Sequence, residues 1–379
     1  MTFMLRTLTS LKDISASDWN ACTAAANPTY NPFTSHEFLL ALELSGSATA
    51  KTGWAAQHLV LEVDNKIEGV VPCYVKSHSM GEYVFDHAWA DAYARAGGNY
   101  YPKLQISMPF TPATGPRLLA ATPEHRKILA DGLVALCGEL GASSAHITFT
   151  SDTEAQESTW LQRNDIQFHW MNHGYKTFED FLASLSSSKR KNMRKERKQV
   201  YDAGITFEQV TDDDLTVGHW DSFYKFYLDT GSRKWGQPYL TRKFFKLIHE
   251  TMKNEVLLIL AKRQGRTIAG ALNFIGGDAL YGRNWGCIEN HPCLHFETCY
   301  YQAIDFAIAH GLKRVEAGAQ GEHKLARGYV PVKTHSLHYL AHPGLSRAVA
   351  EYLDRERRAI DENQRELAEH TPFRHEERE

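Results

Sequence analysis

The stretch from residue 255 to residue 343 constrains the fold more than any other part of the chain. It contains three short β-prone runs separated by glycine-containing turns, at 256–260, 267–274 and 279–285. Short apolar runs joined by such turns are typical of antiparallel strands. Residues 296–310 then place apolar side chains at helical spacing and precede Gly311, the residue type that most often ends a helix. This order predicts an antiparallel meander, a helix, a strand at 314–317 and a polar loop.

The sequence of the first half of the chain predicts elements similar to those of the second half. Trp19 lies in a predicted helix, and Ser35 is placed to cap the next one. A first meander is predicted at 58–63, 67–75 and 83–85, and a long helix at 124–140. The basic stretch at 187–201 and a segment after Pro238 predict two further helices in the second half.

The similarity of the two halves indicates an internal repeat. Trp19 and Trp220 lie 201 positions apart (220 minus 19). Two other pairs of segments keep nearly the same offset, 67–69 with 268–270 and 32–38 with 238–244. A fixed order with nearly constant offsets predicts two copies of one domain. We expect an α/β (α+β) chain with tandem domains at 1–175 and 176–345, each a mixed, mostly antiparallel sheet flanked by helices, and a helical, charged tail at 346–379.

Composition is that of a globular protein. Hydrophobic residues make up 43% of the chain and charged residues 23%, which are ordinary values. Six cysteines in 379 residues are too few for a disulfide scaffold and fit reduced thiols. No apolar run approaches the roughly 18 residues that a membrane helix needs. We therefore expect a cytoplasmic protein without membrane insertion.

A basic segment at 189–198 departs from the net charge of −3. It holds seven Lys or Arg residues and one Glu, and Gly204 is placed to end its predicted helix. The cations of such a helix can simply be solvated by water. Alternatively, the repulsion between them can be relieved by binding a phosphate backbone. We expect a polyanion contact through Lys189, Arg190, Arg194 and Arg197.

The polar segment 318–328 concentrates the groups that acyl transfer requires. Two carboxylates, an imidazole and two cations lie within or just before it, next to three glycines. An amine that attacks an acyl ester or thioester needs a proton acceptor, and positive charge where the oxyanion develops. A solvated loop with salt bridges is the alternative interpretation. We expect catalysis here, with the catalytic candidates Glu322, Lys324, His323 and Glu316.

The sequence of the second half resembles one enzyme family. The matching segments are Phe296-Glu297, Tyr300-Tyr301-Gln302, Gly318-Ala-Gln-Gly-Glu-His-Lys324 and Arg327-Gly328. Over about residues 30–345 the chain resembles the FemAB-like predicted N-acyltransferases, relatives of the Fem aminoacyltransferases. The resemblance implies tandem GNAT-like domains and transfer of an amino acid from charged tRNA to a peptidoglycan precursor. The candidates for substrate binding are Arg283, Trp285, Glu297, Gln320 and Arg327.

Three cysteines and two histidines between residues 287 and 299 are residue types that bind zinc. Their spacing argues against a zinc site. They contain no Cys-x₂₋₄-Cys pair of the usual structural type, and Pro292 with the following helix scatters the side chains over several faces. We expect no metal and no bound cofactor.

The donor is expected to be charged tRNA, with acyl-CoA as the alternative. CoA-dependent enzymes of the GNAT fold carry a glycine-rich turn whose N–H groups bind pyrophosphate. The corresponding junction at 290–297 has no glycine, and segment 111–117 contains two prolines, which lack the N–H donor.

These features together predict an enzyme, an N-acyltransferase. It would move an acyl group, in the favoured case aminoacyl, from a phosphate-bearing activated donor to an amine acceptor such as a peptidoglycan precursor or a small metabolite. The alternatives are an acyl-CoA-dependent GNAT N-acyltransferase and a non-catalytic RNA- or peptide-binding protein on the same fold. The sequence leaves the oligomeric state open.

Overall fold

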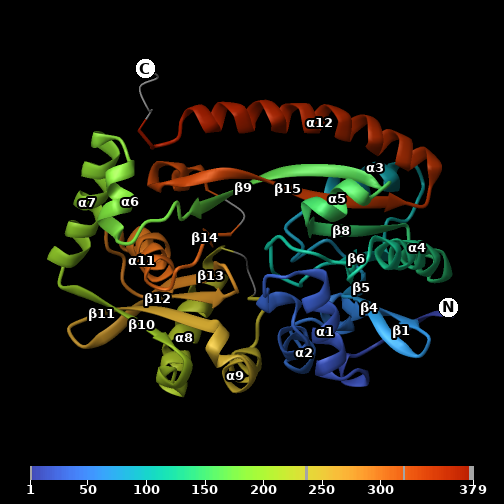
Figure 1. Ribbon diagram of the computed structural model, residues 1–379, viewed down its shortest axis with the longest axis horizontal. Coiled ribbons are helices and arrows are strands. Elements are labelled where there is room, and N and C mark those ends of the chain that lie inside the picture. Colours follow the sequence, from blue (N-terminus) through green and yellow to red (C-terminus); the bar gives the residue numbers. More distant parts are fainter. Residues whose placement is uncertain (1, 235–237, 319–320, 375–379) are drawn as a thin grey trace. The chain divides into compact units, whose positions relative to one another are not determined.

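The computed structural model describes residues 2–234, 238–318 and 321–374, with only the backbone of 232–234 and 322. These residues form two compact units whose elements are labelled in Figure 1. Unit 1 comprises Met1–Asp165, Tyr239–Phe244 and Lys333–Glu362, and unit 2 comprises Ile166–Pro238, Phe245–Val332 and Asn363–Glu379. The chain therefore changes unit within two long strands, β9 (Leu161–Met171) and β15 (Tyr329–Leu340).

Unit 1 contains two groups of paired strands. Their neighbours follow the orders β1-β3-β4-β7 and β15-β8-β6-β5-β2. The elements of unit 1 are β1 (Phe3–Leu8), α1 (Ala16–Ala26), α2 (His36–Leu44), β2 (Trp54–Ala56), β3 (His58–Val63), β4 (Lys66–Val71), β5 (Cys73–Lys76), α3 (His87–Arg95), β6 (Lys103–Ile106), β7 (Leu119–Ala120), α4 (Pro123–Glu139), β8 (Ser144–Thr150), α5 (Asp152–Glu157) and the larger part of α12 (Pro343–Glu369).

Three strands of the second group, β5, β6 and β8, alternate between apolar residues and residues with a polar group. Their apolar side chains, among them Leu104, Ile106 and Ile147, pack with Leu129 and Leu133 of α4 in one core cluster. Successive residues of a strand point to opposite faces. The polar residues of these strands therefore share the other face.

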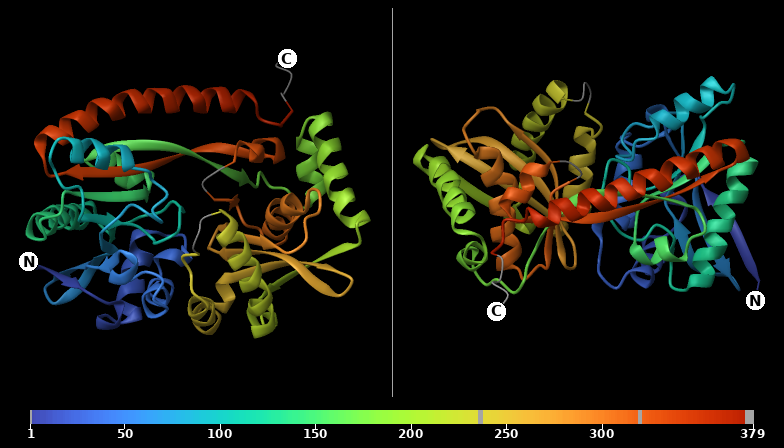
Figure 2. Two further views of the ribbon diagram at one scale, coloured as in Figure 1. Left: turned by 180° about the vertical axis from the view of Figure 1, so that it is seen from behind. Right: turned by 90° about the horizontal axis from the view of Figure 1, so that it is seen from above.

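Unit 2 is built on a sheet with the strand order β10-β11-β12-β13-β14-β9, antiparallel except between β13 and β14. Its remaining elements flank this sheet, and α6 and α7 lie side by side in Figures 1 and 2. The elements are α6 (Phe178–Ser184), α7 (Ser187–Asp202), β10 (Ile205–Thr211), α8 (Val217–Lys234), α9 (Arg242–Thr251), β11 (Val256–Arg263), β12 (Arg266–Ile275), β13 (Ala279–Cys287), α10 (Leu294–Phe296), η6 (Glu297–Tyr301), α11 (Gln302–Ala309), β14 (Arg314–Glu316) and η7 (Glu322–Arg327).

Helix α8 packs directly on the backbone of the unit 2 sheet. A Cβ atom added at Gly286 of β13 would lie 2.2 Å from the carbonyl oxygen of Phe226 in α8. Only glycine permits so close an approach. The helical segment η6–α11 contacts β11, β12 and β13 as well, and its buried residues Tyr301, Ala303 and Ile304 belong to the core.

The predicted meander of the second half, the helix at 296–310 and the basic helix are confirmed as β11–β13, α10–α11 and α7. The predicted strand at 83–85 is wrong. Tyr83 has a φ of 60°, which interrupts extended backbone. The helix expected after Pro238 begins only at Arg242, and residues 333–345, assigned to the second predicted domain, group with unit 1. Among the described residues, no helix has the length and apolar character that crossing a membrane requires.

Candidate functional site

Glu297, a predicted substrate-binding residue, begins a π-helical turn. The turn spans Glu297–Tyr301 and joins α10 to α11. Single π-turns inside helices occur frequently at functional sites. The Glu297 carboxylate is fully buried, and its Oε1 accepts hydrogen bonds from Arg197 Nη2 (2.9 Å) and Gln302 Nε2 (2.8 Å). Its Oε2 has no hydrogen-bond partner among the described atoms, and burial raises the pKa of this carboxyl group.

Arg197 points inward from the basic helix. Besides Glu297, its Nη2 binds Asp305 Oδ2 at 2.7 Å, and its guanidinium carbon lies 4.3 Å from the ring centre of Phe178. These contacts compensate its charge, which the sequence assigned to a polyanion partner. Arg194 forms an ion pair with Glu179 of α6 at 2.5 Å on the exposed side, and Lys189 and Arg190 are half-buried.

We expect the substitution Arg197→Met to destabilise unit 2 by about 2–4 kcal/mol, because it leaves the buried Glu297 carboxylate without its cation. Hydrogen exchange of α11 amides in increasing urea measures the effect. Lys191→Met, at an exposed position of the same helix, is the matched control and should change stability by less than about 0.5 kcal/mol. Equal stability of the two variants would mean that the Arg197 pair is not structural.

Arg327 is also held by protein groups. Its Nη2 lies 2.7 Å from Glu196 Oε1, its Nη1 donates to the His323 carbonyl oxygen at 2.8 Å, and its guanidinium carbon lies 3.4 Å from the ring centre of Phe296. Tyr301 donates to the other oxygen of Glu196. Arg327 thus links η7 to α7 and to Phe296 of α10, which precedes the π-turn, and this makes it a positioning group for the segment.

Lys324 differs from the other cations of unit 2. Its residue is 2% exposed, and among the described atoms its Nζ has one hydrogen bond, to the carbonyl oxygen of Gly318 at 2.9 Å. An ammonium group has three donors. Burial lowers the pKa of Lys324 to about 8, while Cys299 acts weakly in the opposite direction. The structure therefore presents a desolvated cation with donor capacity left over, beside the glycine-containing segment.

His323 precedes this lysine and lies near the π-turn. Its Nε2 is 2.9 Å from the hydroxyl oxygen of Tyr300. Partial burial and the charges of Lys324 and Arg327 lower its pKa. The imidazole is therefore neutral near pH 7 and can accept a proton.

Glu316 belongs to a different group, on strand β14. Its Oε1 accepts from Arg314 Nε at 2.9 Å, and its Oε2 lies 3.8 Å from Nε2 of His169 on the neighbouring strand β9. The charges of Glu316 and Lys324 both act on His169, whose pKa burial lowers. Glu316 is already paired with a cation, which makes it a weaker candidate for the catalytic base.

The structure brings some predicted site residues together and leaves others undescribed. Trp285 of β13 packs edge-on against His295, with ring centres 5.3 Å apart, and His295 lies 6.4 Å from His323. Arg283, two residues earlier on the same strand, is half-buried. Gln320 lies outside the described residues, as does the side chain of Glu322. Within the described part of the chain, no three His, Cys, Asp or Glu side chains meet in a metal-binding arrangement.

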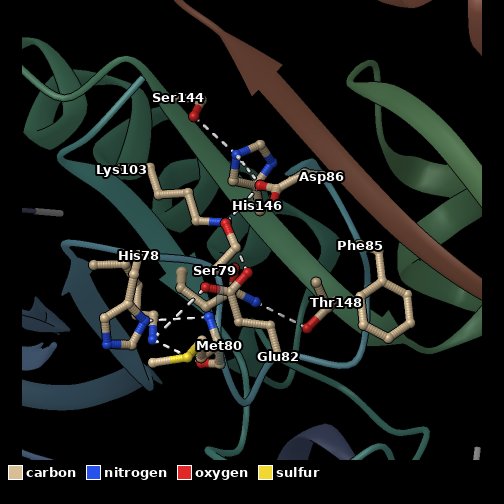
Figure 3. A network of polar contacts seen from close by, with 12 residues as sticks. His78, Ser79, Met80, Glu82, Phe85, Asp86, Lys103, Ser144, His146 and Thr148 are labelled. Carbon is tan, nitrogen blue, oxygen red and sulfur yellow. Dashed lines mark hydrogen bonds and ion pairs between the residues drawn. The ribbon is translucent and has the colours of Figure 1, made fainter. Parts of the chain in front are cut away.

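A second polar cluster, in unit 1, was not predicted from the sequence (Figure 3). Lys103 Nζ lies 2.8 Å from Ser79 Oγ, 2.7 Å from Glu82 Oε2 and 2.5 Å from Asp86 Oδ2. Lys76 Nζ is 3.7 Å from Glu82 Oε1. Both lysines are completely buried. The only sequence signal is the alternation of polar residues along β5, β6 and β8, which normally indicates a face exposed to water.

Comparisons with known proteins give a family and a shared fold. The family model FemAB_like, described as peptidoglycan biosynthesis/recognition, matches residues 10–375. No curated protein sequence matches significantly. Among solved structures, FemX aligns with a TM-score of 0.56 and 12% identity over 92% of this chain and 100% of its own. L-PGS from Bacillus licheniformis aligns with a TM-score of 0.52 and 9% identity over 88% of this chain and 96% of its own. At these identities the two structures show the fold alone, and the predicted fold class is confirmed.

Proposed function

Because the chain belongs to the FemAB-like family, we propose that it is an N-acyltransferase acting on an amine of a peptidoglycan precursor. The description of the family, peptidoglycan biosynthesis/recognition, supports this class of acceptor. The transferred group is aminoacyl in the favoured case, and the donor is charged tRNA in preference to acyl-CoA.

The single observation that carries the proposal is the state of Lys324. Among the described atoms the buried ammonium has one acceptor, the Gly318 carbonyl oxygen, and its other donors are directed to no described acceptor, so they can bind a negatively charged oxygen. Fixed donors in a site with little water stabilise a developing oxyanion more than donors in water do. Arg327, the other cation of the segment, is already engaged with Glu196. Lys324 is therefore assigned to the oxyanion.

The proposed step forms one amide bond and breaks one ester bond. The nitrogen of the acceptor amine attacks the acyl carbonyl carbon, whose oxygen becomes the oxyanion held by Lys324. The C–O bond to the tRNA ribose then breaks. The proton lost by the amine passes to His323, which is neutral and accepts it, and from there to the leaving ribose oxygen. Tyr300, hydrogen-bonded to His323 Nε2, orients the imidazole.

The exposed face of α7 is the proposed docking surface for the phosphate-bearing donor. Lys191, Arg194, Lys195 and Lys198 are exposed on it, and the half-buried Lys189 and Arg190 lie at its start. Arg194 and Lys198 pair with Glu179 and Asp202, but these ion pairs are exposed to solvent and are weak there. Arg197 is removed from the predicted set because Glu297 and Asp305 already compensate it. Clustered cations bind phosphates by releasing counterions, so the affinity should fall as salt rises.

Donor identity is tested by supplying aminoacyl-tRNA or acyl-CoA separately, together with a UDP-linked peptidoglycan precursor, and detecting the amide by mass spectrometry. We expect product with aminoacyl-tRNA and none with acyl-CoA. The Lys324→Met variant, incubated in parallel, controls for uncatalysed transfer to the amine. Product from acyl-CoA alone would overturn the proposed donor. Binding of tRNA by the folded protein without any amide product would favour the non-catalytic alternative.

A further inference from the structure

The polar face of the second strand group in unit 1 is buried, although it carries charged residues. Cross-strand register places Tyr74 opposite Gln105 and Lys76 opposite Lys103, and pairs Gln105 with His146. His146 in turn pairs with His338 of β15. All of these side chains are buried. Polar residues on one face of an antiparallel sheet are normally exposed to water. Because these side chains are buried, other parts of unit 1 must cover this face.

The cations and the carboxylates of this buried cluster belong to different segments of unit 1. The cations, Lys76 and Lys103, come from strands β5 and β6. The carboxylates that neutralise them, Glu82 and Asp86, come from segment 77–100, which connects these two strands. Figure 3 shows Ser79, Glu82 and Asp86 converging on Lys103. Removal of this segment would therefore leave two cations on a surface of hydroxyl, imidazole and amide groups.

The enclosed region also contains polar atoms that form no hydrogen bond within the described residues, although one of them, Glu82 Oε1, lies in the ion pair with Lys76. They are buried and form no hydrogen bond among the described atoms: Tyr74 OH, Glu82 Oε1, Asp86 Oδ1, Gln105 Oε1, Ser107 Oγ and His338 Nε2. Native proteins contain few such atoms, because each costs free energy. Their concentration on one sheet face and on its cover indicates groups that are built for a ligand.

Segment 77–100 has the features of a movable cover. Its outer side exposes Met80 (54%) and Phe85 (59%). Its backbone adopts positive φ at Gly81, Tyr83 and Gly97. Among its residues, all of which the structure describes, α3 is the only helix. Outside α3 the segment lacks helix and strand hydrogen bonds, and such segments open at lower free energy than regular elements. Residues at element ends absorb the backbone rotation of a hinge.

We propose that the polar face of β5, β6 and β8 is a binding site for a small dianion, and that segment 77–100 is its lid. In the closed state Glu82 and Asp86 occupy the positions of the ligand's two negative charges. Two buried ammonium groups require two negative charges for compensation. A dicarboxylate or a phosphomonoester provides them, and Ser144 and Thr148 of β8 add hydroxyl groups.

The protonation of the closed state is consistent with a lid that can be released. Burial raises the pKa of Glu82 to about 7, against the opposing effect of Lys103. Burial likewise lowers the pKa of Lys76 to about 7, against the opposing effect of Glu82. Burial also acts on Asp86, but Lys103 and His146 outweigh it and hold the pKa of Asp86 low. The Glu82–Lys76 contact, at 3.7 Å, is therefore the weakest of the three contacts between these carboxylates and the two lysines.

Calorimetry with glutarate and with inorganic phosphate tests the proposal on the full chain. We expect a dianion to bind the wild type, and to bind Glu82→Gln about tenfold more tightly, because the lid then competes with one charge fewer. Hydrogen exchange of residues 77–100 should become faster when the dianion is added. Neutral glutaramide should neither bind nor change the exchange.

The wild-type titration keeps the test decisive if Glu82→Gln fails to fold. Glu139→Gln, at an exposed position of α4, is the matched control and should bind like the wild type. Binding of glutarate supports a dicarboxylate, and binding of phosphate alone supports a phosphomonoester. The proposal is overturned if neither dianion binds the wild type, or if Glu82→Gln binds no more tightly than Glu139→Gln. It concerns unit 1 and does not depend on the acyltransferase activity.

Discussion

Replacement of Lys324 by alanine should reduce kcat/KM by about 10²–10³-fold, the effect of removing one oxyanion donor. The change removes the buried ammonium, which has a single acceptor within the described part of the chain, and leaves Arg327, which Glu196 already holds. Stability should change little, because the loss of packing around the lysine stem is offset by relief of its burial cost. Single-turnover kinetics with the preferred donor measure the first effect, and thermal unfolding measures the second.

The pH dependence of kcat gives a second readout for the same lysine. Burial lowers the pKa of Lys324 to about 8, so the fraction of ammonium falls as pH rises through that value. The rate should therefore decline above about pH 8, and Lys324→Arg should move this decline to higher pH, because arginine stays protonated. The folded pKa lies below the unfolded value, so the unfolded chain binds more protons between about pH 8 and 10.5. The free energy of unfolding should rise with pH in this window.

Lys313→Ala provides the control for these measurements. Lys313 is exposed and lies near the start of β14, so its removal should leave both rate and stability unchanged. Wild-type turnover in Lys324→Ala would refute the oxyanion assignment. A large fall in the melting temperature of Lys324→Ala would instead show that the lysine is a structural residue.

Local patterns explain why much of unit 2 could be predicted. The strands β11, β12 and β13 are apolar runs joined by glycine turns, and the helix after them has clear periodicity and an ending glycine. The partners of Arg197 could not be found in this way. Glu297 is 100 positions away in sequence, and a helix with cations around most of its circumference does not reveal which of them points inward. The pairing depends on the packing of α7 against the π-turn.

For the buried polar face of unit 1, the sequence pattern is visible but its usual interpretation is wrong. The alternation in β5, β6 and β8 is visible in the sequence, but the usual interpretation is a sheet with one face in water. Burial of Lys76 and Lys103 results from segment 77–100, whose irregular backbone carries no periodic signal. The grouping of β15 and α12 with unit 1 is likewise a tertiary property, since the sequence repeat indicates only the order of elements.

Replacement of Arg117 by methionine should destabilise unit 1 by about 3–5 kcal/mol, as for other broken buried charge networks. Arg117 is fully buried, and its guanidinium donates to the carbonyl oxygens of Ala113 (2.6 Å), Gly115 (2.8 Å) and Thr148 (3.0 Å). The nearby Glu154 carboxylate accepts from the backbone N–H groups of residues 117 and 118. Methionine fills a similar volume but leaves these carbonyl groups without donors. It also removes the charge of Arg117, which adds to the hydrogen bonds from Thr150 and the backbone in opposing the effect of burial on the pKa of Glu154.

Hydrogen exchange of β8 and α5 amides in increasing urea follows unit 1 separately from unit 2, which matters because a chain of two units need not unfold in one step. Arg95→Met, at an exposed position of α3, should change stability by less than about 0.5 kcal/mol. A loss below about 1 kcal/mol in Arg117→Met would mean that water replaces the guanidinium donors at little cost. The proline-containing segment 111–117 would then not depend on Arg117 for its conformation. A loss of the expected size would show that the carbonyl groups of this segment turn inward to the arginine, which supports the view that the segment is a structural anchor of unit 1 and no phosphate-binding turn.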